Sequence, residues 1–135
     1  MKDYRKIQVW QKAHDLTLRV YKETDKFPAS EKYSLVTQMR RACYSIPMNV
    51  AEGCGKSTDA DFARFLDTAA GSASELDYQL LLCRDLDLLD GGTYAQLSSE
   101  LGDLRRMLTN LIKAVRNQDK KRPTSNCEPP IANRQ

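Results

Sequence analysis

The sequence predicts an all-α protein, built as an antiparallel up-down-up-down four-helix bundle. Apolar residues recur with helical period along almost every stretch up to residue 117, and strand-like alternation is nearly absent. Short links separate four long segments, as in a bundle. The chain of 135 residues has the size of one domain. We assign residues 1–118 to the bundle and residues 119–135 to a flexible, basic tail that contains prolines.

The first helix is predicted from about Lys6 to Thr24. Its buried stripe is formed by Ile7, Trp10, Ala13, Leu16 and Val20. Phe27-Pro28 ends it, because the residue before a proline disfavours the helical conformation.

The second helix is predicted to begin near Ser30, a suitable N-cap, and to end at Gly53 and Gly55. Pro47 lies inside it and predicts a kink, because proline removes one backbone hydrogen bond and crowds the preceding turn. The apolar stripe of this helix is Leu35, Met39, Ala42, Ile46 and Val50.

The third helix is predicted from Thr58, its N-cap, to about Leu89, and Asp90-Gly91-Gly92 then forms a turn. The fourth helix is predicted to begin at Thr93, with Gln96 completing a capping box. Its apolar seam is the most regular feature of the chain and consists of Tyr94, Leu97, Leu101, Leu104, Leu108, Leu111 and Val115.

Composition narrows the class of protein. No apolar run is long enough to cross a membrane, and the charged N-terminus does not resemble a secretory signal, so we expect a cytoplasmic protein with reduced cysteines. Residues 59–92 carry two basic and eight acidic side chains, whereas the other segments are net basic. The folded surface is therefore expected either to be polarised or to neutralise itself between neighbouring helices.

The stretch Gly55-Lys56-Ser57 matches the end of a phosphate-binding P-loop. A P-loop requires a glycine five positions before Gly55, where this chain has Val50, and it requires a preceding β-strand. We therefore predict a helix end and a linker at this point.

The sequence also lacks the residue patterns of other catalytic and metal sites. His14 is the only histidine, which excludes the paired Glu-x-x-His motifs of di-iron bundles, and no closely spaced Cys or His pairs suggest zinc. We predict no cofactor, no metal and no enzymatic activity. An enzyme that depends on His14, Asn49 or Glu52 stays as an alternative.

A polar stripe accompanies the apolar one on the second helix, in steps of three and four residues, and the third helix carries a similar pattern. We expect a structural or subunit-interface network in which Arg41 pairs with Glu75 or Glu52, and direct nucleic-acid contact is the alternative. The members of this network are Gln38, Arg41, Ser45, Asn49, Glu52, Ser72 and Glu75.

Several motifs in residues 4–117 carry a resemblance to a known family. They are Val9-Trp10-Gln11-x-Ala13, Phe27-Pro28-x-x-Glu31, Gln38-x-Arg40-Arg41-Ala42, Ser45-Ile46-Pro47-x-Asn49-Val50-Ala51-Glu52-Gly53 and Gly71-Ser72-x-x-Glu75-Leu76. The chain resembles the four-helix-bundle proteins encoded in intervening sequences of bacterial large-subunit ribosomal RNA genes. It is similar, more distantly, to the accessory variability proteins of diversity-generating retroelements.

This resemblance implies a homopentameric ring and no enzymatic activity. For the retroelement branch it implies binding of nucleic acid and of a reverse transcriptase through basic surfaces. We therefore expect a non-enzymatic oligomer that binds RNA or DNA through phosphate contacts. The candidate contacts are Lys2, Arg5, Lys6, Lys12, Arg40, Arg41, Arg105, Arg106, Lys113 and Arg116, and Tyr4 and Tyr44 are candidate stacking residues.

A second hypothesis is a structural assembly module. Such a module recruits a protein partner, for example a reverse transcriptase, without touching nucleic acid itself.

Overall fold

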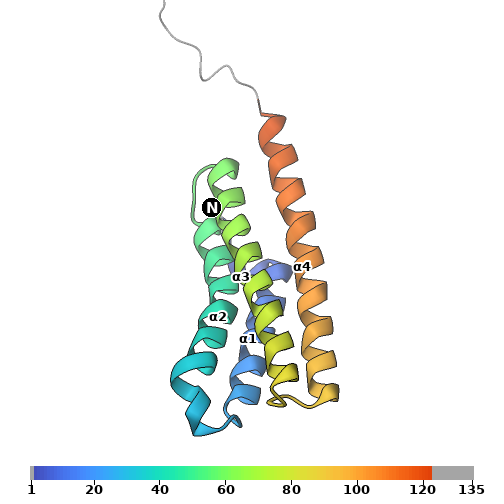
Figure 1. The fold of residues 1–135 in the computed structure, drawn as a ribbon. Coiled ribbons are helices and arrows are strands. Elements are labelled where there is room, and N and C mark those ends of the chain that lie inside the picture. Colours follow the sequence, from blue (N-terminus) through green and yellow to red (C-terminus); the bar gives the residue numbers. More distant parts are fainter. Residues whose placement is uncertain (1, 123–135) are drawn as a thin grey trace, which may run out of the picture.

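The protein is described by a computed structural model that covers residues 2–122. Within that range it has four α-helices and no β-strand, which confirms the predicted all-α class (Figure 1). The helices are α1 (Gln8–Thr24), α2 (Thr37–Cys54), α3 (Asp59–Asp85) and α4 (Gly91–Lys120). Residues 123–135, most of the predicted tail, lie outside the described residues, and α4 continues to Lys120, just past the predicted boundary at residue 118.

One hydrophobic core runs between the four helices. Each helix contacts the next one along the chain, and α1 also contacts α4. The predicted seam of α4 is confirmed at Leu97, Leu101, Leu104, Leu108 and Val115, which are buried, whereas Tyr94 and Leu111 are only partly buried. In α1 the stripe is confirmed at Ala13, Leu16 and Val20, whereas Ile7 and Trp10 are only partly buried.

The N-terminal segment packs beside the end of α2. A short 3₁₀ turn, Tyr4–Lys6, precedes α1, and the Asp3 carboxylate accepts the backbone N–H of Arg5 at 3.1 Å. The backbone N–H of Lys2 donates to the carbonyl of Cys54 at 3.3 Å. Residues 2–6 therefore extend the surface that α1 and α2 form together.

The start of α2 corrects the prediction at Ser30. Residues Ala29–Glu31 form a 3₁₀ turn, Lys32–Val36 form a π-helical turn, and the regular α-helix begins only at Thr37. Ser30 makes no capping bond. Tertiary contacts decide where regular bonding begins, because Val36 is buried in the core and Arg40 reaches across to the end of α1.

Pro47 lies inside α2 without ending the helix. Proline has no backbone N–H, so the carbonyl of Cys43, four residues earlier, loses its usual donor. The Thr17 hydroxyl of α1 lies 3.4 Å from this carbonyl and 2.7 Å from its own helix's Ala13 carbonyl. A hydroxyl on the neighbouring helix thus partly replaces the missing donor.

Of the two glycines predicted to end α2, Gly55 does so as its C-cap, whereas Gly53 has a different role. Gly53 is a buried helical residue, not a terminator, and a Cβ there would lie 2.8 Å from the Phe62 ring and 3.0 Å from the Cβ of Phe65. Gly55 follows the last helical residue, but with a right-handed φ of −82°. Close packing of α2 against the start of α3 therefore requires Gly53.

The connection between α3 and α4 also differs from the prediction. Thr58 caps α3 as predicted, but α3 ends at Asp85 and not near Leu89. Asp87 adopts a left-handed φ of 60°, and the N–H groups of Asp87 and Leu88 bond back to Arg84 and Cys83 in a Schellman motif. Helix α4 begins at Gly91, and Asp90 is its cap in place of Thr93, accepting the Thr93 N–H at 2.8 Å.

Candidate functional site

The predicted polar stripe forms a hydrogen-bonded seam between α2 and α3. The hydroxyl oxygens of Ser45 and Ser72 lie 2.8 Å apart. The Asn49 amide donates to the Ser45 carbonyl at 2.7 Å and lies 3.0 Å from the Ser45 hydroxyl. All three side chains are half-buried. We call these three residues the α2–α3 seam, and their small size allows the two helices to approach closely.

The other four members of the stripe lie outside this seam. Gln38, Arg41, Glu52 and Glu75 are exposed. The expected ion pair of Arg41 with Glu75 or Glu52 does not form within residues 2–122, and Glu75 instead accepts a hydrogen bond from Gln79 at 3.4 Å. All four of these side chains are exposed to solvent. Arg41 therefore stays available to a partner.

The arginines of α4 are mostly neutralised within the chain. Arg105 lies 3.4 Å from Asp77 and donates to the Ser74 hydroxyl at 3.1 Å. Arg106 pairs with Asp103, one turn away on α4. A shallow hollow of about 370 Å³ lies beside these two arginines.

Arg116 and Lys113 complete the candidate contacts on α4. Arg116 binds both carboxylate oxygens of Asp67, one of them at 3.1 Å. This pairing raises the pKa of Arg116. Lys113 is exposed and makes no ion pair among the described residues. Carboxylates of the acidic segment 59–92 thus neutralise positive charge on α4. Of the two outcomes expected from the charge distribution, this is neutralisation between neighbouring helices.

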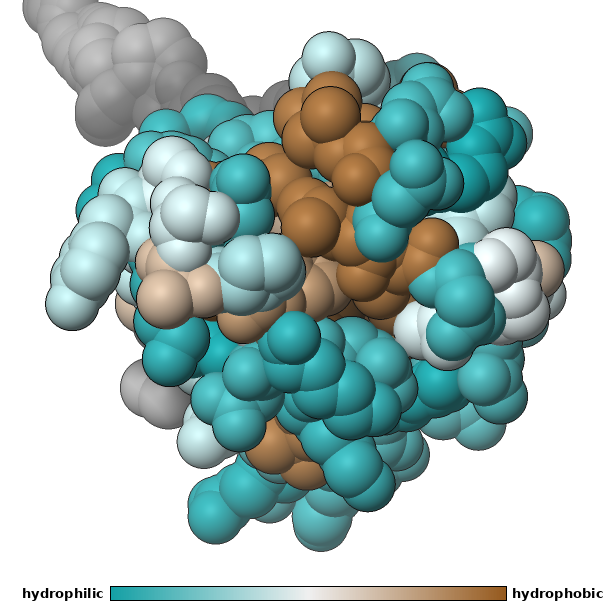
Figure 2. All heavy atoms as spheres, turned by 60° about the horizontal axis from the view of Figure 1, so that its bottom comes forward, coloured by the Kyte–Doolittle hydropathy of each residue, from teal (hydrophilic) through white to brown (hydrophobic). Residues whose placement is uncertain are grey.

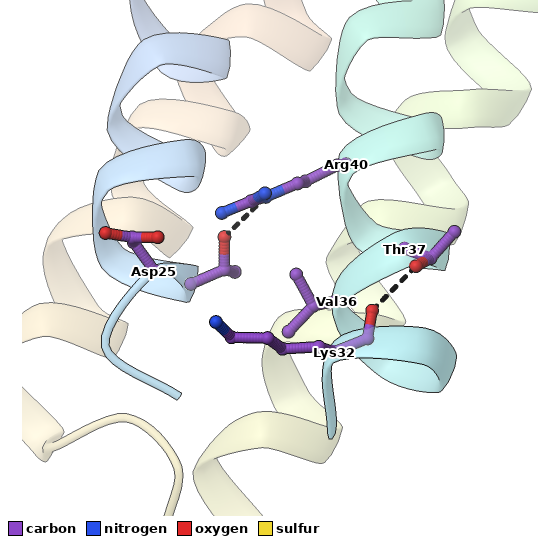
Figure 3. Close-up of a pocket in the computed structure, with 6 residues that line it drawn as sticks. Asp25, Lys32, Val36, Thr37 and Arg40 are labelled. Carbon is purple, nitrogen blue, oxygen red and sulfur yellow. Dashed lines mark hydrogen bonds between the residues drawn. The ribbon is translucent and has the colours of Figure 1, made fainter. Parts of the chain in front are cut away.

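Arg40 has a structural role at the end of α1 (Figure 3). Its Nε donates to the Thr24 hydroxyl at 3.0 Å and its Nη2 to the Tyr21 carbonyl at 3.2 Å. The guanidinium also stacks over the Tyr21 ring, 4.4 Å from its centre. A cation at a helix carboxyl end satisfies free carbonyls and complements the helix dipole. A small pocket of about 110 Å³ with Asp25 and Lys32 in its wall lies beside it.

The N-terminal cations have a different environment. Lys12 is 4.0 Å from Asp103 of α4, and Lys2 lies over the Phe62 ring, 4.9 Å from its centre. Arg5 is 3.3 Å from Asp3 but remains largely exposed, and Lys6 is exposed without an ion pair among the described residues. Arg5 and Lys6 therefore remain close to solvent beside the start of α1.

An aromatic groove between α1 and α2 was missed by the sequence reasoning. It measures about 310 Å³, and its lining includes Tyr4, Trp10, His14, Tyr44 and Met48. The imidazole of His14 stacks on Trp10 at 5.0 Å and an interplanar angle of 9°, and Tyr4 meets the same ring edge-on at 4.9 Å. The spacing Trp10-x-x-x-His14, which places both rings on one helix face, is the signal that could have shown it.

The buried thiols and the P-loop-like stretch do not form the sites that their residue types suggest. Burial raises the pKa of the Cys43 and Cys83 thiols to about 11 each, so both stay protonated near neutral pH. Lys56 lies over the Phe65 ring, 5.0 Å from its centre, and Gly55 ends α2, so the P-loop-like stretch is a helix end followed by a linker. Among the described residues no three potential ligands gather to hold a metal, and no helix there is long and apolar enough to span a membrane.

One end of the bundle exposes hydrophobic side chains. Figure 2 shows them at the end where the α1–α2 and α3–α4 connections lie. Leu86 is 53% exposed, and Leu35 and Leu88 are half-buried. An exposed cluster of this kind often marks a contact with another protein.

Comparisons with known proteins agree with this fold. A comparison with curated proteins finds no match. Among solved structures, the chain is similar to a protein of unknown function from the S23 ribosomal protein family of Bacteroides thetaiotaomicron, with 22% identity and a TM-score of 0.72. That alignment covers 78% of this chain and 95% of the other.

The sequence also matches a protein family over residues 5–110, which include all of α1, α2 and α3 and most of α4. The matched range contains the α2–α3 seam and all of the named groove residues except Tyr4. The family is described by the gene context of its members, and neither this description nor that of the solved structure names a catalytic activity. This chain belongs to the 23S rRNA-intervening sequence protein family.

Proposed function

We propose that the protein is a non-enzymatic assembly unit, which forms an oligomer through the outer surface of α2 and α3. The observation that carries this proposal is the α2–α3 seam together with its surroundings. Three small polar side chains bond to one another at half-buried positions, and the exposed Arg41, one turn before Ser45, makes no ion pair among residues 2–122. A second copy would supply such a partner from Glu52 or Glu75, both of which are exposed.

The contrast with α4 supports this choice of surface. Arg105, Arg106 and Arg116 find acidic partners within the chain, so the three arginines of α4 are already neutralised. The exposed Leu86 at the bundle end, just after α3, also favours protein contact.

The arrangement expected for this assembly is a ring of five antiparallel up-down-up-down bundles. The resemblance to ring-forming relatives implies the number five. The cross-helix pairs fit antiparallel neighbours: Arg105 with Asp77 and Arg116 with Asp67 on α3, and Lys12 with Asp103 and Arg19 with Glu100 on α4.

Native mass spectrometry of the full chain at micromolar concentration tests the proposal. We expect a pentamer, and a monomer would contradict it. The matched pair of variants is Arg41→Ala and Lys113→Ala, since both cations are exposed and lack an ion pair in the described residues. Arg41→Ala should weaken assembly about tenfold or more, whereas Lys113→Ala should leave it unchanged.

Circular dichroism of both variants serves as the control for folding. Equal helical content with a lower oligomer mass in Arg41→Ala assigns the effect to the interface. Equal oligomer masses for both variants would show that Arg41 does not contribute to the contact between subunits.

The alternative function is recruitment of a protein partner by the same oligomer, such as the reverse transcriptase that the more distant resemblance implies. The hydrophobic end shown in Figure 2 is the surface that favours it. A pull-down with Leu86→Lys as the test variant and Leu18→Lys as the control compares two leucines that are both more than half exposed. Equal recovery of a partner by both variants would show that the hydrophobic end of the bundle does not recruit it.

A further inference from the structure

We infer that the aromatic groove between α1 and α2 binds unpaired nucleic-acid bases, as part of single-stranded RNA or DNA. This site goes beyond assembly and does not overlap the α2–α3 seam, since its lining comes from α1, α2 and the N-terminal segment.

The groove exposes flat aromatic rings on which a base can stack. Tyr44 is 38% exposed, and His14 is exposed while its ring stacks parallel to Trp10. One turn beyond Thr17, which also lines the groove, Tyr21 adds a further ring at 38% exposure. Bases stack on such rings without regard to sequence, because every base presents a π-face.

The cations at the two ends of this surface match a phosphate backbone. Arg5 lies over the Tyr4 ring, 5.5 Å from its centre, and its side chain stays 70% exposed although it pairs with Asp3, while Lys6 makes no ion pair in the described chain. At the other end Arg40 stacks on Tyr21. A strand whose bases enter the groove would place its phosphates near these side chains.

The remaining candidate contacts do not offer this combination. On α4, Arg105, Arg106 and Arg116 face carboxylates, and their pocket is lined by Thr109 and Asn110 without an aromatic ring. Carboxylates beside a cation weaken its attraction for phosphate. Among the candidate nucleic-acid contacts compared in this way, cations coincide with several stacking rings at the α1–α2 groove and not on α4.

The single tryptophan of the chain provides the assay, because Trp10 lies in the groove. We would titrate the full chain with a 12-nucleotide oligo(U), with oligo(dT) and with a duplex RNA of equal length, at about 50 mM salt. Quenching of Trp10 fluorescence by either single strand supports the inference. The strand that binds more tightly, oligo(U) or oligo(dT), shows whether the groove prefers RNA or DNA. Absence of binding by both strands, or equal binding by the duplex, would overturn it.

Matched tyrosine variants locate the site. Tyr44→Ala should weaken binding about tenfold, which corresponds to the loss of one stacked base, and Tyr44→Phe should restore it. Tyr78→Ala, at a tyrosine of α3 that is 61% exposed, should bind within about twofold of the parent chain. Arg5→Gln should reduce the salt dependence by about one unit of slope.

Native mass spectrometry of Tyr44→Ala separates this inference from the assembly proposal. An unchanged oligomer mass with weaker binding supports a base-binding groove. A lower mass would show that the groove is a contact between subunits and would overturn the inference, whatever the outcome for Arg41.

Discussion

Helices α2 and α4 bury similar hydrophobic stripes but leave very different outer faces. Helix α4 has a leucine seam without interruption, an aspartate cap, and arginines that find carboxylates within the chain. Helix α2 begins after a π-helical turn without a side-chain cap and contains Pro47. Its exposed Arg41 and Met48 face solvent.

This difference indicates on which side of the molecule the charged and polar groups find their partners within a single chain. On the α3–α4 side, Arg105 and Arg116 pair with carboxylates of α3 in the same chain, and substitutions of exposed residues there should change stability little. On the α1–α2 side, irregular backbone and unpaired side chains remain after folding. Local departures from simple helical rules commonly accompany surfaces with another role.

The largest effect is expected in the α4 seam. Leu104→Ala should lower the free energy of unfolding by about 2–5 kcal/mol, because Leu104 is completely buried and the truncation leaves a cavity. Urea denaturation followed by circular dichroism measures it. The control is Leu18→Ala on α1, a leucine 56% exposed, which should change stability by about 0.5 kcal/mol or less. Similar losses in both variants would contradict the assignment of the core.

The next effect concerns the close contact between α2 and α3. Gly53→Ala should destabilise the protein by about 1–3 kcal/mol, because its Cβ would lie 2.8 Å from the Phe62 ring. Gly71→Ala is the matched control, since a Cβ there meets nothing within 4 Å and alanine favours helix by about 1 kcal/mol. The two substitutions should therefore move the melting temperature in opposite directions. Stabilisation by both would show that Gly53 has room for a methyl group.

A smaller effect tests the substitution of a hydroxyl for the donor lost at Pro47. Thr17→Val should cost about 1 kcal/mol, because it removes a hydrogen bond from a buried position. In a Pro47→Ala background the N–H of residue 47 can bond to the Cys43 carbonyl again, so the same change should cost less. A double-mutant cycle by chemical denaturation measures this coupling. Equal costs in both backgrounds would mean that Thr17 acts only through its bond to the Ala13 carbonyl.

The smallest effect is the acid dependence of the α4 cap. The hydrogen bond from the Thr93 backbone, followed by that from its side chain, lowers the pKa of Asp90. Its contribution to stability is therefore fully present above the ordinary aspartate pKa of about 3.9 and is lost as the pH falls through the lowered value. Asp90→Asn keeps the cap but lacks this titration, so the gap in urea midpoint between parent and variant should narrow from pH 7 to pH 2–3. A gap independent of pH would contradict an ionised cap.

Much of the fold could be predicted because helical periodicity is a local property. The buried stripes of α1 and α4 and the Thr58 cap follow from spacing and from residue type. The Schellman end at Asp87 was missed because the left-handed position carries aspartate and not glycine. Ser30 was mistaken for a cap because a suitable residue type does not by itself decide which bonding pattern follows.

The candidate site was predicted only in its small polar members. Ser45, Asn49 and Ser72 lie together as their spacing suggested, whereas the partners of the arginines were not foreseen. Arg116 finds Asp67, which is 49 residues away along the chain, and Arg40 finds the end of α1. Neither pairing leaves a periodic signal in the sequence.

The sequence by itself determined the helical class, the number of long helices and the hydrophobic faces, because burial of a periodic stripe needs only neighbours three and four residues away. Tertiary structure decided which cations are neutralised, why Gly53 must be glycine and that Tyr4, Trp10, His14 and Tyr44 share one groove. The physical reason is that ion pairing, steric contact and ring stacking act over a few ångströms between residues distant in the chain. Only the packing of the four helices sets those distances.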